Sequence, residues 1–441
     1  MAIAGLCAGL FPFVSPSTDA RYSLAWGAEL LRGELPDLGP ADLPTPHPLP
    51  IAVSVALAPL GAERALDAYE VLCALAFLTL VYALFRFGRA LAGTGAGVLA
   101  AALVALNPRI DFFALRGFID IPFAAAVMLA AALVGEQPRR NWARALGLLA
   151  LAGLLRPEAW GLALLYALWL GFDDRARFPA ALGLAVLGPA VWIGTDLLLA
   201  GDGLHSLHGT QAGADALGRT TGVDDLLPSL TSGLDSLIGW PLAAAGLLTA
   251  GWGLWRAYLP RGRRRDDALA GAERPAYLTA ASLVVAGVGG FALLAVADLP
   301  LNDRYLVVPA LSLVGLAAAA VMRASRSPVL AGAAIVAVAG TLVAAPADVR
   351  AIHDRFSAGR AHHRAEGELE RLLDGPALRA RLAGCERVVA RGDLRAATAS
   401  LLDRDPAAVP IADSPKPGEA GVVAPSVDGP YLLVVRCLGH G

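Results

Sequence analysis

The chain has 441 residues, of which 56% are hydrophobic and only 17% are charged. Soluble domains are typically about 45–50% apolar and about 25% charged, so this composition indicates a membrane protein. The 36 basic and 38 acidic residues leave a formal net charge of -2. No broad basic field points to nucleic acid, and we expect no nucleic-acid partner.

Apolar runs of membrane-spanning length recur along nearly the first 345 residues. The hydrocarbon core of a bilayer is about 30 Å thick and requires about 20 apolar helical residues per crossing. The sequence therefore predicts an all-α polytopic membrane protein with about 11 transmembrane helices in residues 1–346. The expected spans are 1–13 (short), 65–86, 92–107, 118–135, 145–156, 157–171, 179–200, 240–258, 276–297, 305–322 and 328–345.

Arginines in the short loops indicate how these spans are oriented. They cluster in alternate loops, and arginine-rich loops stay on the cytoplasmic side. A single crossing over 145–171 would place its flanking clusters in opposite compartments, so we expect two short spans that meet at the turn Arg156-Pro157-Glu158. The polar segments 14–64 and 201–239 are then loops outside the cytoplasmic membrane.

In the last part of the chain, residues 347–441, the sequence predicts a small extracytoplasmic soluble α/β domain. It is rich in Arg, Asp and Glu, with an expected helix over 359–382. Short runs of strand-forming residues follow at Arg387–Ala390 and Tyr431–Val435. This domain would lie on the same side as the external loops.

Four cysteines exclude a disulfide scaffold and any CxxC zinc module, because Cys7 and Cys73 lie inside apolar runs. Cys385 and Cys437 flank the expected strands, and an oxidising compartment would allow them to form a disulfide. Two free thiols are the alternative, since spacing alone does not fix disulfide geometry.

Charged residues beside helix ends are the leading candidates for a functional site, because charge near a membrane is costly. Asp120 begins a long apolar run, and Arg116, one helical turn earlier, is its expected partner. Four such clusters lie next to the expected outer ends of spans: Asp19-Ala20-Arg21-Tyr22, the prolines around His47, residues 107–120, and Asn302-Asp303-Arg304-Tyr305.

Each candidate also has a purely structural interpretation. Asp19 could cap a helix that begins near Arg21, because a carboxylate there accepts orphan backbone N–H bonds. His47 could be an exposed turn residue between two prolines. Arg116 and Arg304 could be interfacial anchors whose charged ends reach the head groups.

Taken together, the clusters place carboxylates and arginines at the depth of lipid head groups. A carboxylate can act as general base toward an acceptor hydroxyl. Arginines can bind and neutralise a phosphate that departs with negative charge. This combination suits a sugar-phosphate donor that is anchored by a lipid tail.

The order of these motifs resembles the C-type, polyprenyl-phosphate-sugar-dependent glycosyltransferases, in particular the branch of the protein O-mannosyltransferases and the bacterial lipid A aminoarabinose transferases. Ala20 replaces a glutamate common in that branch, and Leu49 interrupts its Pro-Pro pair, so an acidic-pair or metal role in this loop is not expected. The resemblance rests on Asp19-Ala20-Arg21-Tyr22, Pro46-His47-Pro48-Leu49, Asp120, Arg156-Pro157-Glu158, and Asn302-Asp303-Arg304-Tyr305-Leu306 with Pro309.

The resemblance implies the C-type fold and an inverting transfer of a hexose or pentose from a polyprenyl-phosphate donor to an extracytoplasmic glycolipid, cell-wall polymer or protein. Asp19 would be the general base, and Asp120 a second catalytic carboxylate. No cofactor is certain, although carboxylates beside a phosphate could hold Mg²⁺ or Mn²⁺. The donor's phosphate and sugar would be bound by Arg21, Tyr22, His47, Arg116, Arg156, Arg304 and Tyr305.

Two other functions fit the same sequence. A transporter or flippase of lipid-linked sugars would also carry charges in membrane-spanning segments, where they mark a substrate path. The charges here cluster at the outer ends of spans, which favours the transferase. A catalytically silent partner with the same fold is the second alternative, because function depends on the site and not on the fold.

Overall fold

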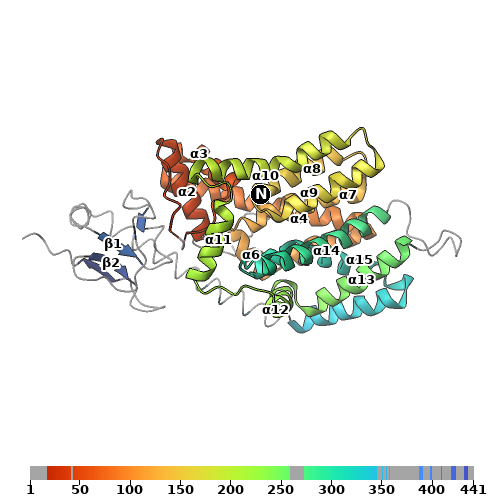
Figure 1. Ribbon diagram of the computed structural model, residues 1–441. Helices are drawn as coiled ribbons and strands as arrows, with labels where there is room; N and C mark the ends of the chain where they lie inside the picture. The colour runs from red at the N-terminus through yellow and green to blue at the C-terminus, as the bar shows by residue number, and fades with distance from the viewer. Residues whose placement is uncertain are drawn as a thin grey trace, which may run out of the picture.

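The computed structural model describes residues 17–40, 43–258 and 273–344, and beyond them three strands and a few single residues. In these ranges the chain is helical almost throughout, and the helices lie side by side in an elongated body (Figure 1). The helices that coincide with predicted spans are α4 (Ala62–Ala92), α5 (Thr94–Ala105), α7 (Asp120–Glu136), α8 (Trp142–Gly153), α9 (Glu158–Asp173), α10 (Phe178–Ala200), α13 (Trp240–Tyr258), α14 (Arg274–Val296), α15 (Val307–Met322) and a helix over Pro328–Ala344.

Other helices connect these elements. Three of them, α2, α3 and α11, lie together at one end of the body (Figure 1). The connecting helices are α2 (Thr18–Leu31), α3 (Pro48–Leu57) with the 3₁₀ turn η1 (Ala58–Leu60), α6 (Pro108–Leu115), α11 (His205–Ala216), α12 (Leu226–Ile238), η2 (Asp303–Leu306) and η3 (Ala324–Arg326).

Local sequence signals explain where several of these helices begin. Ser17 is the N-cap of α2, and its hydroxyl accepts a hydrogen bond from the backbone N of Ala20 at 3.3 Å. Asn107 caps α6 in the same way, and Pro108 follows it at the first helical position. Gly93 separates α4 from α5. Its φ of +84° is a backbone conformation that residues with a side chain rarely adopt, so a glycine is suited to this break.

The protein is a mostly helical membrane protein. Among the described residues, four helices are long and apolar enough to cross a membrane, or up to six if each of two bent helix pairs is one span. Every predicted span from residue 65 onward coincides with a helix, and the span 1–13 lies outside the described residues. The prediction of about eleven crossings is not confirmed, since α5 and α8 have only 12 residues each and about 20 are needed.

The turn around Arg156 separates two helices that pack against each other. Helices α8 and α9 are in contact, and both pack on α10. The Trp160 indole N–H donates to the carbonyl of Gly153 at 2.9 Å across the turn. A Cβ at Gly153 would lie only 2.8 Å from the Trp160 ring, so the glycine permits this close approach. The chain therefore reverses direction here, as the sequence predicted, and is not one long helix.

Ion pairs connect the loops at the end of the body opposite α2, α3 and α11. Arginines of α4 bind the last residue of α7, and further pairs join the loop after α7 to the end of α9 and the loop after α15 to the start of α14. These loops are among the arginine-rich ones that the sequence places on one side of the membrane. The pairs are Arg86 and Arg89 with Glu136, Arg139 with Asp173, and Arg323 with Glu273.

Beyond residue 344, the structure describes a three-stranded sheet in the order β1 (Arg387–Ala390), β2 (Glu419–Val423), β3 (Leu432–Val435). Strands β1 and β2 are parallel, and β2 and β3 are antiparallel. Strands β1 and β3 coincide with runs that the sequence predicts, whereas β2 was not predicted. The predicted helix 359–382 and both cysteines of the proposed disulfide, Cys385 and Cys437, lie outside the described residues, and the α/β domain as a whole stays a prediction.

Two glycines of α13 give a test of how closely the helices pack. A Cβ at Gly246 would lie 2.6 Å from the backbone oxygen of Leu313 in α15, whereas a Cβ at Gly251 would meet no atom within 4 Å. We expect Gly246→Ala to destabilise the protein by roughly 1–3 kcal/mol through overpacking. Gly251→Ala, the matched control, should be neutral or stabilising by up to about 1 kcal/mol. Thermal unfolding in detergent measures both, and equal effects of the two substitutions would contradict the close α13–α15 contact.

Candidate functional site

The first carboxylate of the site, Asp19, lies in the first turn of α2 and binds an arginine from the far end of the sequence. Its Oδ2 accepts a hydrogen bond from Arg304 Nη1 at 3.2 Å, across 285 positions of the chain. Ser17, and not Asp19, is the residue whose side chain caps the helix. The interpretation of Asp19 as a helix cap is therefore wrong, although its place in the first turn still favours a negative charge.

The second carboxylate, Asp120, is fully buried at the start of α7 and forms an ion pair with Arg156 in the turn between α8 and α9. The predicted partner, Arg116, does not fill this role, and its guanidinium lies 5.9 Å from the centre of the Phe112 ring. The prediction assumed one continuous helix. Helix α6 ends at Leu115, however, and Gly117 has φ +66°, so residues 116 and 120 do not share a helix face.

Arg156 is the most enclosed cation of the site. Its Nε also lies 3.3 Å from Glu158 Oε1, and its guanidinium carbon lies 4.1 Å from the centre of the Tyr305 ring. A guanidinium over an aromatic face at this distance is a cation–π contact, which is stronger where water is excluded. The Phe123 ring lies on it as well, with 5.7 Å from the guanidinium carbon to the ring centre, so two carboxylates and two rings fix Arg156 in position.

Arg304 and Tyr305 belong to η2. Contacts of its first residue hold η2 against α6 and α12. The neighbouring Asp303 forms an ion pair with Arg109 of α6 and accepts a hydrogen bond from the Ser236 hydroxyl of α12 at 2.9 Å. The Arg304 guanidinium carbon lies 5.8 Å from the centre of the Tyr305 ring. Both arginines, 156 and 304, therefore contact the same tyrosine.

His47 precedes α3 and lies against the turn that carries Arg156. The backbone N of Leu49 donates to the carbonyl of Leu154 at 3.2 Å, and the imidazole meets the Trp192 ring edge-on with 5.4 Å between centres. His47 is half-buried, so its interpretation as an exposed turn residue is wrong. Burial lowers the pKa of His47 to about 3, and the positive charges of Arg156 and Arg304 act in the same direction against the opposing effect of Asp19. The imidazole is thus neutral at pH 7.

A cavity of about 240 Å³ lies beside this cluster. His47, Arg156, Glu158 and Tyr305 form one part of its wall, and residues of α9, α10, α11, α14 and the adjoining loops form the rest. The wall is mainly apolar, and its polar side chains form two groups, one around Arg156 and one made of Thr45, Asp196, Ser206 and Thr210. Such a distribution is typical of a small-molecule site, in which a few polar groups fix the orientation of the ligand.

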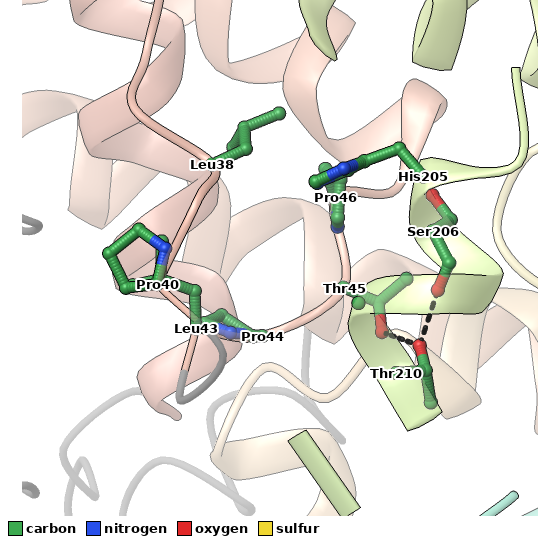
Figure 2. Close-up of a pocket in the computed structure, with 10 residues that line it drawn as sticks. Leu38, Pro40, Leu43, Pro44, Thr45, Pro46, His205, Ser206 and Thr210 are labelled. Atoms are coloured by element: carbon green, nitrogen blue, oxygen red, sulfur yellow. Dashed lines mark hydrogen bonds between the residues drawn. The ribbon is translucent and has the colours of Figure 1, made fainter. Parts of the chain in front are cut away.

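Hydrogen bonds hold the segment before His47 in place. The hydroxyl groups of Thr45 and Thr210 form a hydrogen bond, with 2.7 Å between their oxygens. The Thr210 hydroxyl also donates to the carbonyl of Ser206 at 2.6 Å (Figure 2). The Ser206 hydroxyl and backbone N both donate to the buried Asp196 of α10, at 2.8 and 2.9 Å. Figure 2 shows a smaller pocket between residues 38–46 and the start of α11, next to these bonds.

The other three predicted site residues belong to α2 and to the turn between α6 and α7. Tyr22 is buried in the core between α2 and α3, where its ring packs on Trp26 with 5.5 Å between centres. Arg21 is two residues from Asp19 on the same helix, and side chains at that spacing do not face each other. Arg116 contributes its backbone oxygen, which accepts a hydrogen bond from the N of Ser17 at 2.6 Å and ties the start of α2 to the turn before α7.

Other residues of the site were not predicted from the sequence. Trp160 and Trp192 line the cavity, and Glu158 lines it beside Arg156. Tryptophans are common in the apolar runs of membrane helices, so nothing in the sequence distinguished Trp160 and Trp192 from lipid-facing residues. Glu158 had a signal, since it follows the basic-proline pair directly and carries a charge at a helix start.

No group of three or more His, Cys, Asp or Glu side chains in the described part of the chain is placed to hold a metal ion. Asp19 and Asp120 each bind an arginine instead. A divalent cation brought by the substrate stays a separate hypothesis.

No protein-family model matches the chain, and the comparison with curated proteins found no match. The function is therefore inferred from the site and from the sequence motifs.

A double-mutant cycle tests the buried pair. Arg156→Met alone should destabilise the protein by roughly 3–5 kcal/mol, because it leaves the charge of Asp120 buried without its partner. Arg156→Met combined with Asp120→Leu should recover most of that loss, since neither charge is then buried. Thermal unfolding in detergent measures the cycle. Additive losses would show that the two side chains do not interact.

The pH dependence of stability tests the environment of His47. Its pKa is lowered from 6.5 to about 3 in the folded chain, so between these values the unfolded chain binds a proton that the folded chain does not. Stability should therefore fall as the pH drops below about 6.5, by roughly 1–2 kcal/mol at about pH 5 from this group. His47→Gln should show a smaller fall over the same range. Identical pH dependence of the two unfolding midpoints would mean that His47 is exposed to water.

Proposed function

We propose that the protein is a membrane glycosyltransferase, which transfers one sugar from a polyprenyl-phosphate carrier to an acceptor hydroxyl outside the cytoplasmic membrane, with inversion at the anomeric carbon. The observation that carries this proposal is the meeting of two carboxylate–arginine pairs, Asp19–Arg304 and Asp120–Arg156, at one tyrosine ring. Transfer of a sugar from a lipid phosphate requires a base for the acceptor hydroxyl and cations for the leaving phosphate, and both must lie at one place.

The two pairs differ in exposure, and this difference assigns their roles. The side chains of Arg156 and Asp120 are 7% and 0% exposed, whereas those of Arg304 and Asp19 are 22% and 23% exposed. A substrate phosphate can therefore reach Arg304 more easily than it can displace the buried pair. Arginine binds phosphate through two parallel N–H bonds, so an incoming phosphate competes well for Arg304.

Binding of the donor then prepares the base. Once the phosphate occupies Arg304, the Asp19 carboxylate loses its partner and can accept the proton of the acceptor hydroxyl. The acceptor oxygen attacks the anomeric carbon, and the bond from that carbon to the phosphate oxygen breaks. Polyprenyl phosphate leaves with the electron pair, and Arg156 and Arg304 stabilise its charge. Asp120 takes no proton in this scheme, because its role is to fix Arg156.

The proposal also fixes the position of the chain in the membrane. The end that carries α2, α3 and α11 faces the outside, and the end with the ion-paired loops faces the cytoplasm, as the arginine distribution predicts. In this arrangement α8 and α9 form a hairpin whose turn lies toward the outer side, with Arg156 enclosed beneath the surface.

Release of polyprenyl phosphate in lipid nanodiscs tests the proposal. Purified protein is mixed with a panel of polyprenyl-phosphate sugars and candidate acceptors, and free polyprenyl phosphate is measured. Asp19→Asn should lower the rate by about 100-fold or more, since a general base typically contributes that factor. The matched control is Asp37→Asn, because Asp37 is exposed in the same loop and an asparagine keeps its hydrogen bond to the N of Gly39.

Different results would favour the other functions. Donor that crosses the bilayer without release of polyprenyl phosphate would support a transporter or flippase. Release that is equal in the wild type and in Asp19→Asn would remove Asp19 from the chemistry. A protein that binds no member of the panel is not a transferase of this class.

A further inference from the structure

The cavity beside Arg156 has aromatic side chains fixed in its wall. Trp160 and Trp192 meet edge-to-face with 5.7 Å between ring centres. Each indole N–H already has a partner, since Trp160 donates to the carbonyl of Gly153 and Trp192 donates to the Ser206 hydroxyl at 3.0 Å. Both rings are thus held in one orientation, and neither needs a ligand to satisfy its N–H. What remains available is apolar ring surface, which packs well against the C–H face of a small ring.

Two buried side-chain atoms in the same wall have no hydrogen-bond partner in the described part of the chain. They are Glu158 Oε2 and His47 Nδ1. The other carboxylate of the wall, Asp196, is different, because both of its oxygens accept hydrogen bonds from Ser206. A buried carboxylate oxygen without a partner is costly, and His47 Nδ1 is a second acceptor in the tautomer that carries its proton on Nε2, so the two atoms favour a ligand with hydroxyl groups.

Size and position narrow the class of ligand. The volume of about 240 Å³ is below the roughly 300–1,000 Å³ of sites for drug-sized ligands, so the cavity suits one small ring and not a polyprenyl chain. Arg156 and Tyr305 line the cavity on the side where the proposed function places the phosphate. The charge of Asp19 acts on His47, so the cavity also lies within electrostatic range of the proposed base.

We infer that this cavity binds the sugar ring of the donor, with Glu158 and His47 accepting hydrogen bonds from its hydroxyls and Trp160 and Trp192 packing against its apolar face. The inference rests on the proposed function and assigns the part of the site that selects the sugar. Glu158 has two tasks in this assignment, since one oxygen holds Arg156 and the other contacts the sugar.

Comparison of two lipids in nanodiscs tests the inference without any acceptor. The probes are undecaprenyl phosphate and undecaprenyl phosphate linked to mannose, glucose or arabinose. The wild type should bind at least one of the linked forms about tenfold more tightly than undecaprenyl phosphate itself, which corresponds to the net gain of one or two hydrogen bonds. The ratio of the two dissociation constants, for undecaprenyl phosphate and for its sugar-linked form, measures the contribution of the sugar alone.

Two variants remove the sugar contacts by different means. Leu299→Trp places a large ring in the cavity from a half-buried leucine of its wall, and Glu158→Ala removes both carboxylate oxygens. Each should bring the ratio close to one, and Leu299→Trp should leave the affinity for undecaprenyl phosphate within about twofold. Leu217→Trp, a change at an exposed leucine after α11 and outside the cavity, is the matched control and should keep the wild-type ratio. Thermal unfolding of each variant checks its fold.

The outcomes separate this inference from the proposed function. A wild type with equal affinity for both kinds of lipid, or a folded Leu299→Trp variant with an unchanged ratio, would overturn the sugar site. An equal loss of both affinities in Leu299→Trp would assign the cavity to the phosphate or the lipid tail instead. A wild type that binds neither lipid would overturn the proposed function itself.

Discussion

The ion pair between Asp120 and Arg156 is the interaction on which the rest of the site depends. Removing two charges from water costs several kcal/mol each, and only their mutual attraction and further contacts compensate that cost. Arg156 finds those contacts in Glu158 and in the Tyr305 ring. Because the partners come from α7, from the turn between α8 and α9, and from η2, these three elements cannot separate without exposing a buried charge to an apolar interior. The pair therefore fixes the relative positions of the elements that carry the other site residues.

Around this fixed centre the site becomes progressively more open. The pair between Asp19 and Arg304 lies nearer the surface, and backbone hydrogen bonds attach the starts of α2 and α3 to other turns: the N of Ser17 donates to the oxygen of Arg116, and the N of Leu49 donates to the oxygen of Leu154. Helices α2 and α3 are thus held at their first residues, directly beside Asp19 and His47. Such an arrangement holds Asp19 and His47 with the precision of the helical body, while the Asp19–Arg304 pair stays partly exposed to a charged ligand.

Much of the helical layout could be predicted from the sequence, because apolar runs and the proline turn at Arg156 are local signals. The charged clusters were also visible, since charge beside a membrane is costly wherever it occurs. The partners of those charges could not be predicted from the sequence. The local partner assigned to Asp120 was wrong because Gly117 ends the helical spacing, and the true partner is 36 positions away. Tyr22 was assigned to the site on a motif, whereas the packing of α2 on α3 places it in the core. Trp160 and Trp192 gave no signal, because only the fold distinguishes a cavity wall from a lipid-facing surface.

The two ends of the body use the same kinds of charged residue, but their pairs are arranged differently. At the end opposite the site, the pairs join neighbouring loops and helix ends, and they range from the exposed Arg139 to the buried Arg323, which lies over the Tyr277 ring. Exposed pairs contribute about 0–1 kcal/mol, so an arginine such as Arg139 matters more for the proposed orientation of the spans than for stability. At the site, two pairs meet at one ring, Tyr305, and Arg156 lines a cavity. A guanidinium held beside a cavity keeps its charge available for a ligand that brings a negative charge of its own. Under the proposed function, chemistry is therefore expected at the end where two arginines meet beside a cavity.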